Sequence, residues 1–183
     1  MRLLVPFLLA ALVPVLASGQ PASDDLPPQK VSPAPDGSSW QPSETQARRL
    51  VKATRDYFAD QDDARFEDAY AFFSPDQKRT VPFEKWRADR AQFHAKAGAF
   101  ESRTVRKLTW YRNPPGAQPG VYAAADFSDQ FENVALHCGY VAWHQRMDGS
   151  FEIVHEEENL VDKATAARMS PEMLQRAHAA FKC

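Results

Sequence analysis

Apolar residues recur every three or four positions in three consecutive stretches, which is the spacing of one face of a helix. The first stretch begins at Ser43, which together with Gln46 has the pattern of a capping box. The second runs from about Asp63 to Phe73, and the third from about Phe83 to Ala97, where Gly98 is the expected stop. The pattern therefore predicts three helices in succession.

The second half of the chain alternates apolar and polar residues, with many β-branched and aromatic side chains, which predicts strands. Asp148-Gly149 is a signal for a hairpin turn, and Ser170-Pro171 is typical of a helix start. We therefore expect an α+β fold: three N-terminal helices packed on a curved, mostly antiparallel four-stranded sheet, then a short C-terminal helix. Such a sheet would form a cone with one open end. The expected strands are Arg103–Tyr111, Val121–Phe131, Val134–Arg146 and Phe151–Val161.

The chain begins with the features of a secretory signal peptide. One positive residue precedes an apolar run from Leu3 to Leu16, and small residues follow it, so residues 1–19 are expected to be the signal peptide. The run is too short for a convincing membrane span, and no later segment is apolar enough for one. Residues 20–42 are rich in proline and are expected to form a disordered tether, which leaves residues 43–183 as a single cone-like domain. We therefore expect a periplasmic or secreted protein.

The charge composition excludes some classes of partner. The chain has 22 Lys and Arg against 24 Asp and Glu, a formal net charge of −2. This balance gives no basic surface for nucleic acid or for an anionic membrane. The chain has only 7 Gly, and it lacks the phosphate-cradling glycine loop and the dinucleotide fingerprint. We therefore expect no cofactor.

Only two cysteines occur, Cys138 and Cys183. In an oxidising compartment an even number of cysteines is typical of pairing, so we favour an internal Cys138–Cys183 disulfide. Two free thiols, or one thiol used for a dimer, are the alternatives. A bond closing this loop would stabilise the fold by about 4 kcal/mol in the chain-entropy model.

Several short motifs resemble a known family in their order and spacing. They are Trp86, Gly98 with Ser102-Arg103, Pro119-Gly120-Val121-Tyr122, Phe127 with Phe131, and Asp148-Gly149-Ser150-Phe151. Over roughly Thr45 to Leu160 the chain resembles exported bacterial proteins grouped as domain-of-unknown-function family 4019, in the nuclear-transport-factor-two-like (cystatin-like) superfamily. The resemblance implies this architecture and export. It implies no activity, because the function of that family is unknown.

Arg90 interrupts an apolar helical stripe that contains Trp86, Phe93 and Ala97. An arginine buried at this position needs a partner, usually a carboxylate. One interpretation is an anion-binding arginine at the mouth of the cone. The alternatives, which we favour, are a structural ion pair, or an aliphatic stem packed flat with its charged head in water.

The segment from His155 to Asn159 is the densest acidic run. On a strand, His155 and Glu157 share one face, while Glu156 and Glu158 share the other. A carboxylate held in an apolar pocket would have a raised pKa and could act as a general base. The alternative, which we favour, is a solvated edge strand. The candidate pocket residues are Trp86, Arg90, Phe93, Tyr122, Tyr140, His155 and Glu157.

His137 and Cys138 invite a metal interpretation because both residue types bind zinc. Adjacent strand residues point to opposite faces, however, so these two side chains cannot easily share one ion. No paired spacing of a zinc site is present. We therefore expect no metal site.

The missing catalytic patterns favour an exported, non-catalytic binding or scaffold domain. It would hold a small apolar ligand in the cone, or present its sheet to a protein partner. One alternative is a small isomerase- or dehydratase-like enzyme that uses an acid and a tyrosine in the cone, with Tyr122 or Tyr140 as donor. Another is a structural protein that self-associates through its sheet face, for example as a homodimer.

Overall fold

The computed structural model describes residues 25–183, so the expected signal peptide, residues 1–19, lies outside the described residues. Within this part, the strands are β1 (Gln29–Val31), β2 (Phe100–Arg112), β3 (Val121–Phe131), β4 (Val134–Gln145) and β5 (Phe151–Asp162). The helices are α1 (Glu44–Asp62), α2 (Phe66–Ala71), α3 (Pro75–Thr80), α4 (Phe83–Ala97), α5 (Lys163–Ala166) and α6 (Pro171–Phe181). No helix of residues 25–183 combines the length and apolar character that crossing a membrane requires.

The strands form one mixed sheet in the order β1-β2-β3-β4-β5, in which β1 runs parallel to β2 and the other neighbours are antiparallel. The expectation of a four-stranded sheet is therefore corrected to five strands. The added strand, β1, lies in the proline-rich range 20–42, where we expected a disordered tether. Trp110 Nε1 donates to the side chain of Gln29 at 2.9 Å, and Val31 and Trp40 pack against the core. These contacts hold the segment against the sheet.

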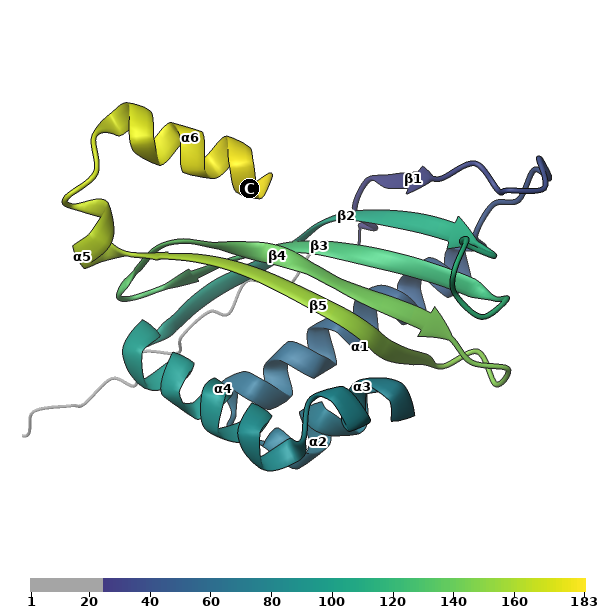
Figure 1. The fold of residues 1–183 in the computed structure, drawn as a ribbon, viewed down its shortest axis with the longest axis horizontal. Coiled ribbons are helices and arrows are strands. Elements are labelled where there is room, and N and C mark those ends of the chain that lie inside the picture. Colours follow the sequence, from purple (N-terminus) through teal and green to yellow (C-terminus); the bar gives the residue numbers. More distant parts are fainter. Residues whose placement is uncertain (1–24) are drawn as a thin grey trace, which may run out of the picture.

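Helices α1–α4 cover one face of the sheet, and α6 lies over the opposite face (Figure 1). We call these the helix-covered face and the outer face. The expectation of three N-terminal helices is corrected to four, because Ser74-Pro75 begins a short helix of its own, α3. Ser74 Oγ accepts from the backbone of Gln77 at 3.2 Å, and Pro75 occupies the first turn, where its missing N–H costs nothing.

The other helix boundaries follow the caps expected from the sequence. Ser43 and Gln46 form a capping box at the start of α1, in which Ser43 N donates to Gln46 Oε1 at 2.8 Å. The third expected helix is confirmed as α4. Gly98 ends it with a φ of 78°, a conformation that glycine adopts without strain. Ser170 accepts from Met173 N at 3.3 Å at the start of α6.

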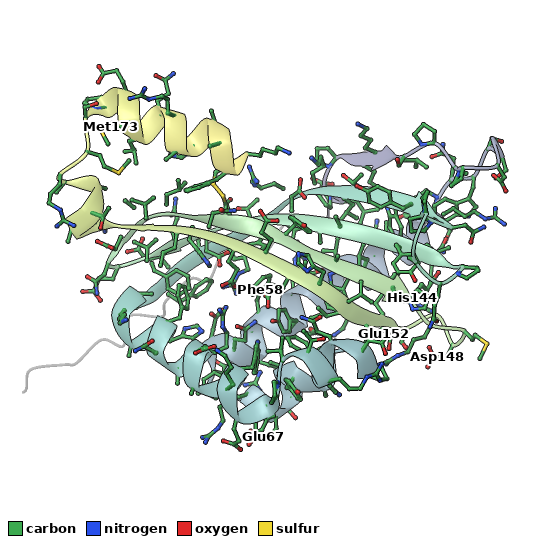
Figure 2. All side chains as sticks on the ribbon, in the orientation of Figure 1. Phe58, Glu67, His144, Asp148, Glu152 and Met173 are labelled. Carbon is green, nitrogen blue, oxygen red and sulfur yellow. A yellow bond between two sulfur atoms is a disulfide. The ribbon has the colours of Figure 1, made fainter. Side chains whose placement is uncertain are left out.

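Aromatic side chains fill the space between the sheet and α1–α4. Their rings meet edge-on or tilted, and the centroids of Phe58 and Phe127 lie 4.6 Å apart. Figure 2 shows Phe58 between the helical layer and the sheet. The cone expected from the sequence is thus occupied largely by the protein's own side chains. The largest fully buried side chains include Trp110, Trp143, Tyr57, Phe73 and Phe127.

A bulge in β5 decides which of its side chains face the helices. Trp143 of β4 pairs with Ile153, but its neighbour Ala142 pairs with His155, so Val154 is an extra residue in β5. The side-chain alternation is therefore shifted by one residue between the two sides of the bulge.

The chain between α2 and α3 pairs with β5 next to this bulge. Ile153 N donates to Phe72 O at 2.7 Å, and Ser74 N donates to Ile153 O at 2.8 Å. These two hydrogen bonds satisfy backbone groups at the free edge of β5. They also fix α2 and α3 against the sheet.

The Cys138–Cys183 disulfide is confirmed, and it joins residues that are 45 positions apart with Cα atoms 5.7 Å apart. It fastens the chain beyond α6 to β4. Arg106 adds hydrogen bonds to the same end, because its guanidinium donates to the carbonyls of Lys182, at 2.8 Å, and of Cys183. None of the residues of α6 is buried, so this helix depends on the anchor at its C-terminal end.

Candidate functional site

Two carboxylates, an arginine and a tyrosine form a cluster between α1, α4 and β5. The bulge in β5 turns Glu156 and Glu158 to the helix-covered face. Tyr57 Oη donates to Glu156, 2.9 Å from each carboxylate oxygen. Arg90 Nη1 donates to both oxygens of Glu158 at 2.6 Å, and these two side chains are each only 17% exposed. Each ionisable group thus has the partner that burial requires.

Burial changes the protonation of this cluster. It raises the pKa of Glu156 to about 8, and the neighbouring Glu158 adds to the rise. Burial also raises the pKa of the Tyr57 hydroxyl, and the charge of Glu156 works in the same direction. Burial by itself would lower the pKa of Arg90, but the two glutamates outweigh it and the pKa rises. At neutral pH Glu156 therefore keeps its proton.

A second network of charged side chains joins α1 to β2, β3 and β4. Arg103 donates to Asp129 through Nε at 2.8 Å and through Nη2 at 2.9 Å, a bidentate pair. Arg103 Nη1 also donates to Asp62 at 2.6 Å, and its guanidinium carbon lies 4.2 Å from the centroid of the Phe58 ring. His137 Nδ1 lies 3.1 Å from Asp129 Oδ2. Because the Asp129 side chain has no exposed surface, these partners replace water.

Two nitrogens of these networks are buried without a hydrogen-bond partner among the described residues: Arg90 Nε and His137 Nε2. Both side chains lie beside Phe93. The Arg90 guanidinium carbon is 5.7 Å from the centroid of the Phe93 ring, and the His137 ring centroid is 4.9 Å from it. Leaving such a group unsatisfied costs about 1–3 kcal/mol. The surroundings of Phe93 thus combine apolar packing with unused hydrogen-bonding capacity.

Phe93 also lines a cavity of about 690 Å³ at the end of α4, which we call the Phe93 groove. The other apolar residues of its lining include Ala97, Val134 and Leu160, and Leu160 is 48% exposed. Ligand sites commonly measure roughly 300–1,000 Å³, so the groove is of suitable size. Its charged lining residues balance in sign, and they are Asp89, Lys96, Asp162 and Lys163.

Three of the expected pocket residues, Trp86, Arg90 and Phe93, lie on α4 at the helix-covered face. Trp86 is a core residue with 4% exposure, and its ring lies 5.6 Å from that of Tyr70 and 5.4 Å from that of Phe73. Arg90 forms the ion pair described above. Of the three, Phe93 lines the groove.

The other four expected pocket residues, Tyr122, Tyr140, His155 and Glu157, lie on the outer face. His155 and Glu157 are exposed there because the extra residue Val154 shifts the alternation of β5. Tyr122, Tyr140 and Glu157 line a different groove, of about 480 Å³, next to the end of α6. The structure therefore does not bring the seven residues into one pocket but divides them between the two faces of the sheet.

The sequence did not reveal which residues pair with the two buried arginines, Arg90 and Arg103. Asp129 carried a usable signal, because it is the charged position in the alternating apolar face that contains Phe127 and Phe131. Tyr57 gave no comparable signal, since a tyrosine in an apolar helical stripe is ordinary core material. The acidic pocket residue expected from the sequence was Glu157, but the bulge at Val154 leaves it exposed and turns Glu156 inward instead.

The two residues considered for a metal site have other roles. Cys138 is used in the disulfide, and His137 faces Asp129. Within residues 25–183, no group of three histidine, cysteine or acidic side chains is placed to hold a metal ion.

The fold and these clusters define a class of small α+β domain: a mixed sheet with one helix-covered, charge-bearing face and one outer face with a disulfide-anchored helix. Residues 53–155 match the family described as "Protein of unknown function (DUF4019)". Because this segment is more than half of the chain, the chain belongs to that family. No curated protein and no solved structure matches the chain. The matched segment runs from within α1 into β5 and contains most of the helix-covered core, while Glu156, Glu158 and α6 lie beyond it.

Proposed function

We propose that this protein is an exported, non-catalytic binding domain that holds a small molecule in the Phe93 groove. The ligand has an apolar body and a head that accepts hydrogen bonds. The observation that carries this proposal is the pair of buried, unpartnered nitrogens, Arg90 Nε and His137 Nε2, in side chains that lie beside Phe93, a residue of the groove lining. The expected signal peptide and the disulfide support export, because disulfides persist in oxidising compartments.

The apolar body of the ligand follows from the lining of the groove. Phe93, Ala97, Val134 and Leu160 offer a continuous set of carbon surfaces, and Leu160 remains 48% exposed. Covering such surface is favourable by roughly 25 cal/mol for each Å² removed from water. An aliphatic chain is the simplest occupant, since the charged lining residues cancel in sign and attract neither a polyanion nor a polycation.

The accepting head follows from the chemistry of the buried Arg90 nitrogen. Arg90 Nε–H can only donate, and Glu158 already occupies Nη1 of the same guanidinium. An acceptor that reaches Nε would remove the cost of an unmet donor. Phe93 is the neighbour that the groove and both nitrogens share, so rotation of its side chain would open the route.

Decanoate is a suitable probe, because it has an aliphatic body and an accepting head. We expect it to bind the purified protein in isothermal titration calorimetry. Leu160→Glu places a charge on the apolar lining and should weaken binding by about tenfold or more. Met147→Glu is the matched control, because Met147 is another large apolar residue that is exposed but lies in the β4–β5 turn. Equal weakening by both substitutions, or no binding of decanoate, would overturn the proposal.

Export is tested separately from ligand binding. Mass spectrometry of the protein from fractionated cells should find, outside the cytoplasm, a chain that begins close to Gln20. A full-length chain that stays in the cytoplasm would contradict the export part and leave the binding part standing.

An acid–base enzyme is the second candidate, and one observation favours it. Tyr57 and Glu156 form a hydroxyl–carboxyl pair at 2.9 Å, and a pKa of about 8 suits a general acid or base near neutral pH. The reaction class would be proton transfer at a carbon next to a carbonyl. Solvent-deuterium incorporation into 2-decanone tests it: exchange that Glu156→Gln abolishes would establish the enzyme and contradict the non-catalytic proposal.

A further inference from the structure

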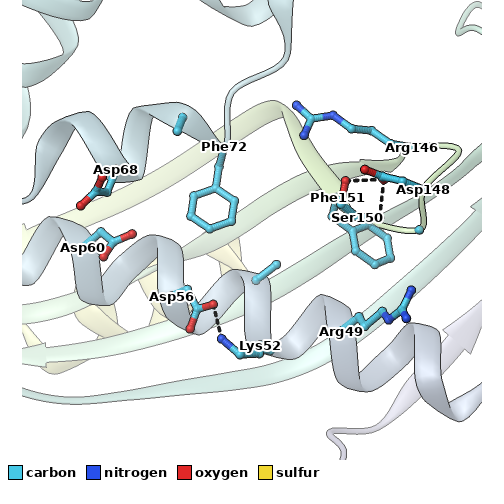
Figure 3. A pocket seen from close by; sticks show the side chains of 13 residues that line it. Arg49, Lys52, Asp56, Asp60, Asp68, Phe72, Arg146, Asp148, Ser150 and Phe151 are labelled. Atoms are coloured by element: carbon cyan, nitrogen blue, oxygen red, sulfur yellow. Dashed lines mark hydrogen bonds and ion pairs between the residues drawn. The ribbon is translucent and has the colours of Figure 1, made fainter.

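A second cavity, of about 670 Å³, lies between α1, the end of α2 and the β4–β5 hairpin (Figure 3). We call it the α1–hairpin trough. It is separate from the Phe93 groove, which has none of the same lining residues. The trough is lined by Arg49, Lys52, Ala53, Asp56, Asp60, Asp68, Ala71, Phe72, Arg146, Asp148, Gly149, Ser150 and Phe151.

The charges of the trough are separated along its length. Figure 3 shows Asp60 and Asp68 at one end, and Arg49 and Arg146 with Asp148 at the other. Arg49 and Asp60 lie on the same helix, and eleven residues of helix span about 16 Å. The lining carries three cationic and four anionic side chains, so a polyanion or a polycation gains little from it. The layout instead complements a molecule with opposite charges at its two ends.

Several of these charges already have partners. Lys52 Nζ lies 2.6 Å from Asp56, Arg146 Nε lies 2.9 Å from Glu152, and Asp60 lies 2.6 Å from Arg65. The charges that lack a close partner stand at opposite ends of the trough.

Those two charges are Arg49 and Asp68. Arg49 makes no hydrogen bond or ion pair with another residue in the described part of the chain. Asp68 has only a long contact to Arg65, at 3.9 Å, and its side chain is 68% exposed. Both are therefore available to a ligand.

The guanidinium of Arg49 lies close to Gly149 of the hairpin turn, at one end of the trough. Gly149 has a φ of 81°, and Arg49 Nη1 lies 2.6 Å from the place where a side-chain carbon of residue 149 would stand. A larger residue at 149 would displace this flexible guanidinium, and the positive φ itself favours glycine. The Asp148-Gly149-Ser150-Phe151 motif, which contributes to the family resemblance, therefore shapes this cavity. Every lining residue except Arg49 and Lys52 lies in the segment that matches the family.

Between its two ends the trough is lined by Phe72 and by the Lys52–Asp56 ion pair (Figure 3). The lining also includes Ala53, Ala71 and the ring of Phe151, which lies near the hairpin end of the trough (Figure 3). Aromatic rings of this kind give large contact area to an apolar side chain. The trough thus offers an aromatic ring between an end with Asp60 and Asp68 and an end with Arg49.

We propose that the α1–hairpin trough binds a short peptide with free termini. The peptide carboxylate would pair with Arg49, its ammonium group with Asp68 and Asp60, and a central apolar side chain would lie on Phe72 and Phe151. An extended chain spans about 3.3–3.6 Å for each residue, so about five residues match the length of the trough.

The test uses the pentapeptide Ala-Ala-Phe-Ala-Ala in four forms: free, N-acetylated, C-amidated and doubly blocked. Calorimetry on the purified protein should show the tightest binding for the free peptide. Each single block should weaken it by about tenfold, because it removes one charge-assisted contact. Equal affinity for all four forms, or no binding of the free form, would overturn the proposal.

Substitutions locate the site. Arg49→Gln should weaken binding of the free peptide but leave that of the C-amidated form unchanged, since the two changes remove the same contact. Arg55→Gln is the matched control, because it makes the same charge change at another exposed position of α1 and should change nothing. Leu160→Glu, in the Phe93 groove, should leave peptide binding unchanged. An equal effect of Arg49→Gln on all four peptides would contradict the assignment.

Discussion

The two faces of the sheet are stabilised in different ways. The helix-covered face packs large aromatic side chains, and two networks of paired charges lie among them. The outer face is covered in part by α6, none of whose residues is buried and whose end is held by a disulfide and by Arg106. Packing and charge pairing therefore determine one face, whereas a covalent bond determines what covers the other.

Two aspartates of β3 give the strongest test of this difference, because they have the same chemistry on opposite faces. Asp129, on the helix-covered face, has a fully buried side chain that is paired with Arg103. Asp129→Ala leaves Arg103 with one fewer partner in the interior, so we expect a loss of about 3–5 kcal/mol of unfolding free energy. Urea denaturation followed by Trp fluorescence measures it.

Asp126→Ala is the matched control on the outer face. Asp126 pairs with Lys107 at 2.7 Å, but the Lys107 side chain is 47% exposed. An exposed pair of this kind contributes about 0–1 kcal/mol. If the two alanine variants lost similar amounts of unfolding free energy, the proposed difference between the two faces would be contradicted.

Cys183→Ser should produce the next largest effect. Removing the disulfide frees the end of α6 and should cost about 2–4 kcal/mol, through the entropy of the unfolded chain. Thermal unfolding in oxidising buffer measures the loss, and the wild-type protein in reducing buffer is the control, since it should match the variant. A wild-type protein that is equally stable under both conditions would contradict this account of the outer face.

The third effect depends on pH and belongs to the helix-covered face. Because burial raises the pKa of Glu156 from 4.5 to about 8, the folded state keeps a proton that the unfolded state releases between these pH values. The stabilisation is complete below the unfolded pKa and is lost as the pH rises through about 8. The melting temperature of the wild-type protein should therefore fall between about pH 5 and about pH 9.

Glu156→Gln resembles the protonated side chain and should remove this part of the pH dependence. Glu157→Gln is the control, since Glu157 is exposed on the outer face. An equal fall in Glu156→Gln and in the wild-type protein would contradict this account, because Glu156 would then release its proton at the same pH in the folded and unfolded states.

The smallest effect is expected from Tyr122→Ala. The Tyr122 ring stacks on His144 with centroids 4.6 Å apart, on the outer face where both side chains are only partly buried. Losing such a contact should cost about 1 kcal/mol or less. A loss as large as that of Asp129→Ala would show that the outer face carries more of the stability than its burial indicates.

Local patterns in the sequence predicted most of the fold. The bounds of α4 and β3, the capping box at Ser43 and the hairpin at Asp148-Gly149 were all read from residues close together in the chain. The disulfide was also favoured correctly, because only two cysteines were available to pair. These features depend on propensity and spacing, which a single sequence displays.

The features that the sequence analysis missed depend on distant contacts. Strand β1 pairs with β2 because that edge of β2 is free and because Trp110 donates a hydrogen bond to Gln29. A proline-rich stretch of sequence predicts neither contact. The bulge at Val154 coincides with the backbone pairing of Phe72 to Ile153, which brings together residues on different elements. Without the bulge, the alternation that turns Phe151 and Ile153 inward would continue to His155 and Glu157. Glu156 and Glu158 would then lie on the outer face.

We propose that the ligand site lies on the helix-covered side, beside Phe93, and not on the outer face. A nitrogen–proton NMR titration of the protein with decanoate tests it most directly. We expect the backbone amide signals of Phe93, Ala97 and Leu160 to shift. The signals of Tyr122 and Tyr140 should not change. Shifts confined to Tyr122, Tyr140 and the end of α6 would move the site to the outer face and contradict the account.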